Sequence, residues 1–169
     1  MSSDFIQNRI RGRRQNNDEM RDRALKLAAL GFRVFKLPVN AKVPPVNQFF
    51  DVATSDPRKV RETFTDPVSG ESLDNNIGVL TGESLIVIDV DRKKNQDGFA
   101  SLAMLKEDFG LDTDTLTALT PSGNLHLFYK IPQDVVVNNS VRKFAPGIDV
   151  RGHHGYVAGV GSVTPDGEY

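Results

Sequence analysis

Short apolar runs rich in β-branched residues follow one another along the chain, and they constrain its fold more than any other feature. Gly, Pro and Asn residues that favour turns separate successive runs. This pattern is typical of sheets whose neighbouring strands are largely antiparallel. The segments predicted as strands are residues 32–37, 77–80, 85–90, 116–119, 125–131, 148–150 and 156–160. Residues 81–84, Thr-Gly-Glu-Ser, suit the turn of a hairpin that joins the second and third of these strands.

Three segments carry helix signals instead. Asn16 and Glu19 have the spacing of a capping box, apolar residues then recur at helical spacing, and Gly31 is placed to end this first helix. Asp56-Pro57 resembles an N-cap followed by the first helical position, which predicts a short helix toward Phe64. Residues 98–109 form a third helical pattern, followed by Gly110. Together these elements predict an α+β fold, an antiparallel sheet with flanking helices.

Composition excludes several classes of protein. The 169 residues suffice for one domain with a hydrophobic core. The absence of Cys excludes disulfides, cysteine nucleophiles and thiolate zinc sites. No apolar run approaches the roughly 18 residues of a membrane span, and the N-terminus lacks the apolar region of a secretion signal. We therefore expect a cytoplasmic protein that does not interact with membranes.

Positive charge is concentrated at the N-terminus. Residues 1–36 hold nine Arg and Lys against four Asp and Glu, whereas the remaining residues hold 12 against 18. We divide the chain into a basic arm, residues 1–15, and a single domain, residues 16–169. The arm is either a solvated tail or a contact for nucleic-acid phosphates. The candidate DNA-binding residues are Arg9, Arg11, Arg13 and Arg14.

The strand at residues 85–90 ends in a pair of acidic residues. Because side chains alternate along a strand, Asp89 and Asp91 project to one side, with Cα atoms roughly 6.5–7 Å apart. Two carboxylates this close are unfavourable unless a cation lies between them or water solvates both. Their hard oxygen atoms suit Mg²⁺ or Mn²⁺. This segment alone is consistent with two interpretations, a metal site and a strand end whose carboxylates are solvated.

Two other strands add polar groups in the same alternating way. Asp149 and Arg151 share one face of their strand, and His126 lies on another strand just after a polar turn. In this turn, Ser122, Gly123 and Asn124 can offer backbone N–H groups to phosphate oxygens. His126 and Arg151 are candidate nucleotide-binding residues. The alternatives are that His126 is a core histidine and that Arg151 forms a structural ion pair with Asp149. Lys42, in a Pro-rich loop, either binds triphosphate or is solvated.

If these strands are neighbours, three carboxylates, an imidazole and a guanidinium line one sheet surface. This set meets the needs of nucleotidyl transfer, in which two divalent ions activate a hydroxyl and basic groups hold the triphosphate. A metal-dependent nuclease and a catalytically decayed nucleic-acid-binding module of a replication initiator are the alternatives. A rolling-circle initiator is disfavoured because Asn124 and Phe128, rather than histidines, lie two residues either side of His126.

The ordered motifs of the chain resemble one family from about residue 24 to residue 169. These motifs read G-F-x-V-F-x-L, K-x-P, A-T-x-D-P, I-G-V-x-T-G, L-x-V-I-D-V-D, T-P-S-G-x-x-H-L-F-Y, G-I-D-V-R-G, G-Y-V and G-S-x-x-x-D-G-x-Y. They resemble the bifunctional primase/polymerase (prim-pol) family of the archaeo-eukaryotic primase superfamily, found in phage and plasmid replication proteins. The resemblance implies a core related to the RNA-recognition-motif fold. It also implies that Asp89 and Asp91 form the first metal-binding motif, Ser122 and His126 the nucleotide-binding motif, and Asp149 the third metal ligand.

The chain departs from the family at one position of the second motif. The family commonly has two glycines before the His, and Asn124 replaces the second; Asn tolerates a left-handed backbone better than other residues with a Cβ. Some relatives carry a zinc-binding insertion, but this chain has no Cys and we expect no zinc.

The resemblance also implies cofactors and partners. It implies a template-dependent DNA primase/polymerase that uses two Mg²⁺ or Mn²⁺ ions, nucleoside triphosphates and a DNA template or primer. We expect an isolated monomeric domain that is the N-terminal fragment of a larger replication protein, with a helicase domain as the candidate C-terminal partner.

Overall fold

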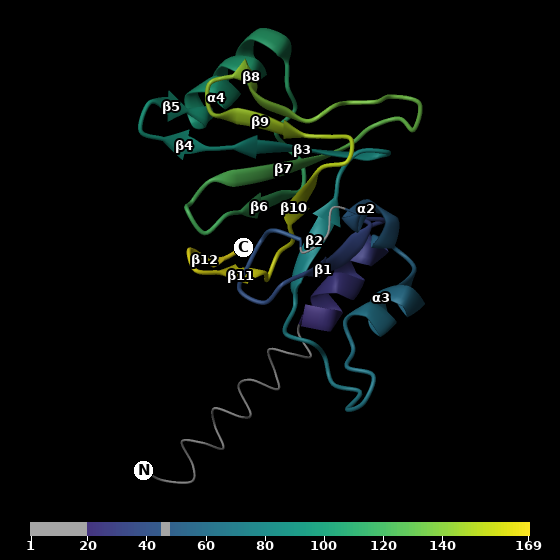
Figure 1. Cartoon of the computed structure of the whole chain (residues 1–169). Helices are drawn as coiled ribbons and strands as arrows, with labels where there is room; N and C mark the ends of the chain where they lie inside the picture. The colour runs from purple at the N-terminus through teal and green to yellow at the C-terminus, as the bar shows by residue number, and fades with distance from the viewer. Residues whose placement is uncertain (1–19, 45–47) are drawn as a thin grey trace, which may run out of the picture. The chain divides into compact units, whose positions relative to one another are not determined.

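The computed structural model describes residues 20–44 and 48–169, which divide into two compact units (Figure 1). The first unit contains the described residues up to Val79 together with Ala158–Pro165, and the second contains Leu80–Val157 and Asp166–Tyr169. In the part of the chain described, no helix is long and apolar enough to cross a membrane.

The first unit begins with a helix whose described residues are 20–29. Gly31, at φ +88°, ends it: its N–H donates to Ala28 O, and the N–H of Phe32 donates to Leu27 O at 3.2 Å. This pair of bonds is the Schellman motif, which satisfies carbonyl groups at a helix end. The predicted stop at Gly31 is confirmed, while the proposed capping box lies outside the described residues.

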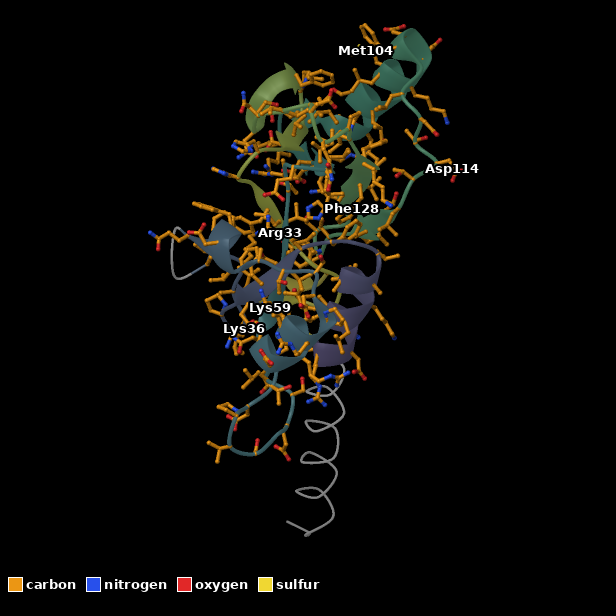
Figure 2. The ribbon with its side chains drawn as sticks, turned by 90° about the vertical axis from the view of Figure 1, so that its right-hand side faces the viewer. Arg33, Lys36, Lys59, Met104, Asp114 and Phe128 are labelled. Atoms are coloured by element: carbon orange, nitrogen blue, oxygen red, sulfur yellow. The ribbon has the colours of Figure 1, made fainter. Side chains whose placement is uncertain are left out.

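A three-stranded sheet has the order β1-β2-β10. It consists of β1 (Val34–Leu37), β2 (Asn76–Leu80) and β10 (Tyr156–Ala158), and the division between the units falls within β2 and β10. Helices α2 (Phe49–Val52) and α3 (Pro57–Thr63) lie between β1 and β2 in the chain. Asp56 caps α3 as predicted, accepting from the N–H groups of Arg58 and Lys59. The side chains of Lys36 on β1 and Lys59 on α3 are exposed (Figure 2).

The second unit contains a five-stranded antiparallel sheet in the order β6-β7-β3-β9-β8. Its strands are β3 (Leu85–Val90), β6 (Thr117–Leu119), β7 (Leu125–Lys130), β8 (Ser140–Ala145) and β9 (Ile148–Arg151). Two short strands, β4 (Arg92–Lys93) and β5 (Gln96–Asp97), form a hairpin between β3 and α4 (Gly98–Phe109). The chain ends with β11 (Val163–Thr164) in the first unit and β12 (Gly167–Glu168) in the second.

Helix α4 packs on one face of this sheet and forms its hydrophobic core. Asp97 caps the helix, and Gly110 ends it in the left-handed conformation at φ +67°. Met104 is part of the exposed surface of α4 (Figure 2). The buried core residues are Ile88, Val90, Leu105, Leu127, Ala145 and Ile148.

The α+β fold with antiparallel sheets is confirmed, but the predicted hairpin of β2 and β3 is wrong. The turn itself forms, because Gly82 and Leu85 exchange backbone hydrogen bonds of 2.6 and 2.9 Å. However, β2 and β3 belong to different sheets, and each is a central strand. Strand β2 is paired on both edges with β1 and β10, and β3 is paired on both edges with β7 and β9, so β2 and β3 cannot pair with each other. Elements that were not predicted are helix α2, strand β8 and the short strands β4, β5, β11 and β12.

Candidate functional site

The candidate residues of the second unit converge on Asp89, at the centre of the five-stranded sheet. In the strand register, Asp89 on β3 lies opposite His126 on β7 and opposite Asp149 on β9. Directly opposed residues project from the same face of a sheet. Their neighbours Val90, Leu125 and Ile148 belong to the core on the other face. The polar residues therefore line the face that α4 does not cover.

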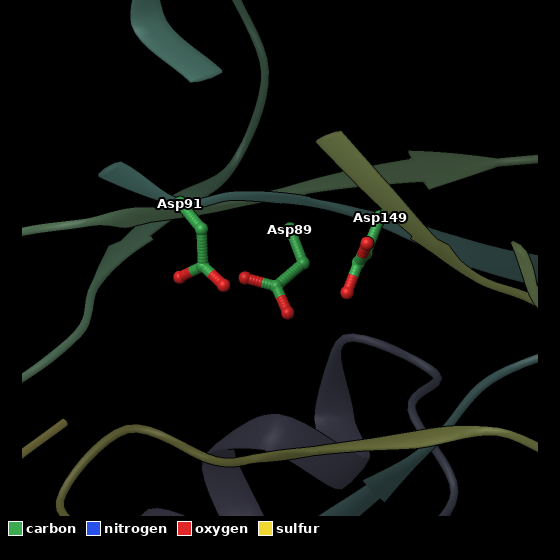
Figure 3. A group of neighbouring side chains, drawn as sticks. All are labelled: Asp89, Asp91 and Asp149. Atoms are coloured by element: carbon green, nitrogen blue, oxygen red, sulfur yellow. The ribbon is translucent and has the colours of Figure 1, made fainter. Parts of the chain in front are cut away.

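Three carboxylates meet on this face. Asp89, Asp91 and Asp149 each offer an oxygen atom, and these atoms all lie within 4.8 Å of one another. Figure 3 shows the side chains on the same side of the strands, with Asp89 between the other two. Asp89 and Asp149 are buried, at 8% and 9% exposure. A close cluster of hard oxygen donors fits a divalent ion such as Mg²⁺ or Mn²⁺.

Arg151 links two of the carboxylates. Its Nη2 donates to Asp89 Oδ2 at 2.8 Å and to Asp149 Oδ2 at 3.2 Å, and its Nε donates to Asp89 Oδ2 at 3.3 Å. Burial acts to lower the pKa of Arg151, but the hydrogen bond to Asp89 and the negative charges of the three aspartates outweigh it, so that the pKa is raised. Arg151 is thus a permanent cation at the cluster. The ion pair with Asp149, one of its two interpretations from sequence, is present and extends to Asp89.

Asp91 is held by other groups. Its Oδ2 pairs with the ammonium of Lys93, and its Oδ1 accepts a hydrogen bond from Asn124 Nδ2 at 2.9 Å. Its backbone is fixed as well: the Asp91 N–H donates to Gly147 O at 2.8 Å, and Asp91 O accepts from the Gly98 N–H at 3.0 Å. A Cβ on Gly147 would lie 2.5 Å from Asp91 O, so this close packing of three backbones requires glycine.

The turn before His126 is closed by its own hydrogen bonds. The N–H groups of Gly123 and Asn124 donate to the backbone oxygen and the hydroxyl of Thr120, at 2.9 and 3.1 Å. The Ser122 hydroxyl lies 3.0 Å from that of Thr120. The left-handed residue is Gly123, at φ +76°, and Asn124 is not left-handed. The turn therefore does not need the tolerance of Asn for a left-handed backbone, and the side chain of Asn124 bonds to Asp91 instead.

His126 is buried at 6% exposure, and its Nε2 lies 3.6 Å from Asp89 Oδ1. Its ring centroid is 5.9 Å from that of Tyr169, with the planes tilted by 30°. The structure thus brings His126 to the carboxylate cluster, as the strand alternation predicts. Tyr169 is an additional neighbour that no local sequence signal connects with His126.

Two groups of candidate residues belong to other parts of the chain. Lys42 lies in the first unit, exposed in the loop after β1. The arginines at positions 9, 11, 13 and 14 lie outside the described residues.

Comparison with known families identifies a match over most of the chain. The family model described as "Bifunctional DNA primase/polymerase, N-terminal" matches residues 24–169. Among curated proteins, no match to the chain is found. The resemblance drawn from the ordered motifs is confirmed over the same residues.

Proposed function

The chain belongs to the bifunctional DNA primase/polymerase family, and from this premise we propose that it catalyses template-dependent nucleotidyl transfer with two divalent ions. Family membership implies DNA primase/polymerase chemistry in general terms. The observation that carries the specific proposal is the cluster of Asp89, Asp91 and Asp149, whose carboxylate oxygens lie within 4.8 Å of one another.

The three aspartates would hold Mg²⁺ or Mn²⁺. When bound, such ions activate a sugar hydroxyl and neutralise charge on the phosphates. The protein contributes by keeping three acidic groups together on a rigid sheet: Asp89 and Asp149 are paired in register on neighbouring strands, and the backbone of Asp91 is bonded to Gly147 and Gly98. This arrangement supports metal-assisted transfer rather than chemistry by a protein nucleophile.

Arg151 is suited to bind the triphosphate of the incoming nucleotide. Its contacts with Asp89 and Asp149 use Nε and Nη2. A guanidinium has five N–H donors, so the two on Nη1 remain for phosphate oxygens. The side chain is 32% exposed, which gives a ligand access to it.

His126 is proposed as a second phosphate contact. If it donates a hydrogen bond to the β- or γ-phosphate, His126→Ala raises the KM for nucleotide more than it lowers kcat. A core histidine would instead lower the melting temperature without a selective effect on KM. Steady-state incorporation at varied nucleotide concentration, with melting of the same variant, separates these roles. A pure stability loss with normal KM would refute the phosphate role.

The N-terminal arginines and Lys42 are proposed to contact DNA and nucleotide, respectively. If Arg9, Arg11, Arg13 and Arg14 neutralise DNA phosphates, deletion of residues 1–15 weakens DNA binding. It also lowers the slope of log affinity against log salt by roughly 0.7–0.9 for each phosphate that is no longer neutralised. An unchanged slope would identify the arm as a solvated tail.

Primer extension tests the proposed activity directly. A labelled primer on a DNA template is incubated with nucleoside triphosphates and Mn²⁺ or Mg²⁺, with EDTA as the control, and the template is labelled to detect cleavage. We expect metal-dependent extension without template cleavage. Cleavage without extension would support a nuclease, and DNA binding with neither product would support a decayed binding module.

A further inference from the structure

Asp91 differs from the other two aspartates in the groups that hold it. Asp89 and Asp149 share one cation, Arg151, whose side chain is 32% exposed. Asp91 has a neutral amide on one oxygen and a lysine ammonium on the other, and the Lys93 side chain is 55% exposed. One partner of Asp91 is therefore buried and the other reaches solvent.

The buried partner, Asn124, is held in one orientation. Its side-chain Oδ1 accepts a hydrogen bond of 3.0 Å from the backbone N–H of Arg92. Because an N–H can only donate, the amide oxygen must face Arg92, and the NH₂ group must face Asp91. That NH₂ group also donates to Ser122 Oγ at 3.1 Å. The residue is only 5% exposed, so water would not replace the hydrogen bonds that a turned amide would lose.

This orientation fixes the carboxylate as well. The amide donor holds Asp91 Oδ1 at 2.9 Å and so sets the rotation of the carboxylate group. A hydrogen-bond donor that orients a metal ligand commonly changes metal affinity about 10- to 100-fold when removed. An Asn at position 124 thus supplies a donor that a glycine there would lack.

Lys93 acts on the same carboxylate in the opposite sense. Its ammonium occupies Asp91 Oδ2, which a metal ion would also approach. An exposed ion pair is weak, equivalent to a change of at most about fivefold in an equilibrium constant, and lysine has a flexible stem, so a divalent ion can displace it. The Lys93 ammonium therefore neutralises Asp91 at the oxygen where a metal would have to displace it.

We propose that Asn124 is a positioning residue for Asp91 and that Lys93 is a competitor for the same carboxylate, so that the two residues set metal affinity in opposite directions. This inference rests on the proposed function, because it takes Asp91 to be a metal ligand.

Mn²⁺ titration of the full chain without nucleotide, followed by the electron paramagnetic resonance of free Mn²⁺, tests the inference. We expect Asn124→Ala to raise the Kd about 10-fold, and Asn124→Gly, the residue common in the family, to do the same. We expect Lys93→Gln to lower the Kd by about two- to fivefold, the equivalent of one exposed ion pair. Lys94→Gln is the matched control, because it removes the same charge from the neighbouring exposed residue.

A second measurement follows Lys93 itself. Reductive ¹³C-methylation gives each lysine a resonance, and the Lys93 peak is the one that Lys93→Gln removes. We expect Mg²⁺ to shift this peak toward its position in Asp91→Asn, where the ion pair is absent, and to leave the Lys94 peak in place. A purely structural role for Lys93 would not produce this response.

The outcomes separate the inference from the proposed function. If the wild type binds Mn²⁺ no better than Asp89→Asn, the proposed metal site fails. If Asp89→Asn abolishes binding but the Asn124 and Lys93 variants keep the wild-type Kd, the site stands and the inference is overturned. Equal effects of Lys93→Gln and Lys94→Gln would overturn direct competition in favour of general electrostatics.

Discussion

The two faces of the five-stranded sheet both contain buried residues, but one face is apolar and the other is acidic. On the α4 face, Val90 and Ile148 are fully buried among apolar side chains. One residue away on the same strands, Asp89 and Asp149 are buried at 8% and 9% exposure. Strand alternation alone separates them, since successive side chains point to opposite faces. Neighbouring positions of one strand therefore belong to different environments, one to the hydrophobic core and the other to the proposed metal site.

The difference lies in what each face needs in order to be buried. Apolar residues gain free energy when they leave water, whereas a carboxylate loses it unless a partner compensates. On the polar face, Arg151 provides that partner for Asp89 and Asp149. The acidic face is thus tolerated because of its cations, and we expect changes of its residues to leave the packing of the core intact.

The largest expected effect comes from the polar face. Asp149→Asn keeps the size of the side chain but removes the charge of a proposed metal ligand. We expect primer extension to fall more than about 100-fold, beyond the 10- to 100-fold typical of residues that only orient ligands. We expect the free energy of unfolding in EDTA to change little, because the weaker interaction with Arg151 is offset by relief of carboxylate repulsion. Extension at the wild-type rate would remove Asp149 from the site.

The neighbouring residue on the apolar face should behave in the opposite way. Ile148 is completely buried in the α4 core. We expect Ile148→Ala to lower the free energy of unfolding by about 2–5 kcal/mol through reduced apolar burial and the cavity left behind. Urea unfolding measures this loss, with Ile148→Val as the milder control. A loss no larger than that of Asp149→Asn would break the contrast between the faces.

Gly147 connects the two faces, because it supports the backbone of Asp91 and adjoins Ile148. It has φ +72°, and an added Cβ would lie 2.5 Å from both Asp91 O and Gly98 N. We expect Gly147→Ala to reduce both stability and Mn²⁺ affinity, the stability by about 1–3 kcal/mol as for other strained residues.

Gly110→Ala is the matched control for Gly147. Gly110 has a similar φ of +67°, but nothing lies within 4 Å of an added Cβ. Gly110→Ala therefore measures the cost of the left-handed backbone without the clash that a Cβ makes at Gly147. Equal stability losses for the two variants, with Mn²⁺ affinity unchanged, would show that the close approach at Gly147 does not position Asp91.

Local signals in the sequence predicted much of this arrangement. Gly31 and Gly110 end helices as expected, and alternation places Asp89 with Asp91 and Asp149 with Arg151. Which strands pair was harder to predict. The turn at Gly82 forms, but β2 and β3 each pair with strands from other parts of the chain. Strand β8 was not predicted, because its sequence, Ser-Val-Arg-Lys-Phe-Ala, has a short and broken apolar pattern.

The partners of Asp91 were not predicted for a related reason. Asn124 is 33 positions from Asp91 in the chain, and their contact depends on how β3 and β7 pair. The conformational propensity of Asn predicted a role for the backbone of Asn124. The structure instead shows a hydrogen bond from its side chain to Asp91. Lys93 contacts Asp91 just where β3 gives way to the β4–β5 hairpin. The Asn124 contact follows from tertiary structure, whereas the Lys93 contact is local and joins residues two positions apart.

The smallest expected effect concerns Asp97, an exposed carboxylate that caps α4. Its side chain accepts from the N–H groups of Phe99 and Ala100 at 3.0 and 3.3 Å. The Ala100 hydrogen bond, supported by the charge of Arg92, lowers the pKa of Asp97 below its ordinary value of 3.8. Because the folded pKa is the lower one, the stabilisation is fully present above the unfolded pKa and is lost as pH falls through the folded pKa.

Asp97→Ala should therefore lower the melting temperature at neutral pH by less than Ile148→Ala does. The difference from the wild type should shrink as the pH is lowered below about 4, where Asp97 begins to protonate in the unfolded chain. Asp97→Asn is the control, since an amide oxygen can still cap the helix but carries no charge. Thermal melting of the three proteins over a pH series measures the effect. If the Asp97→Ala difference persisted unchanged into strong acid, the charge of Asp97 would contribute nothing to stability, and the side chain would act only as a neutral hydrogen-bond acceptor.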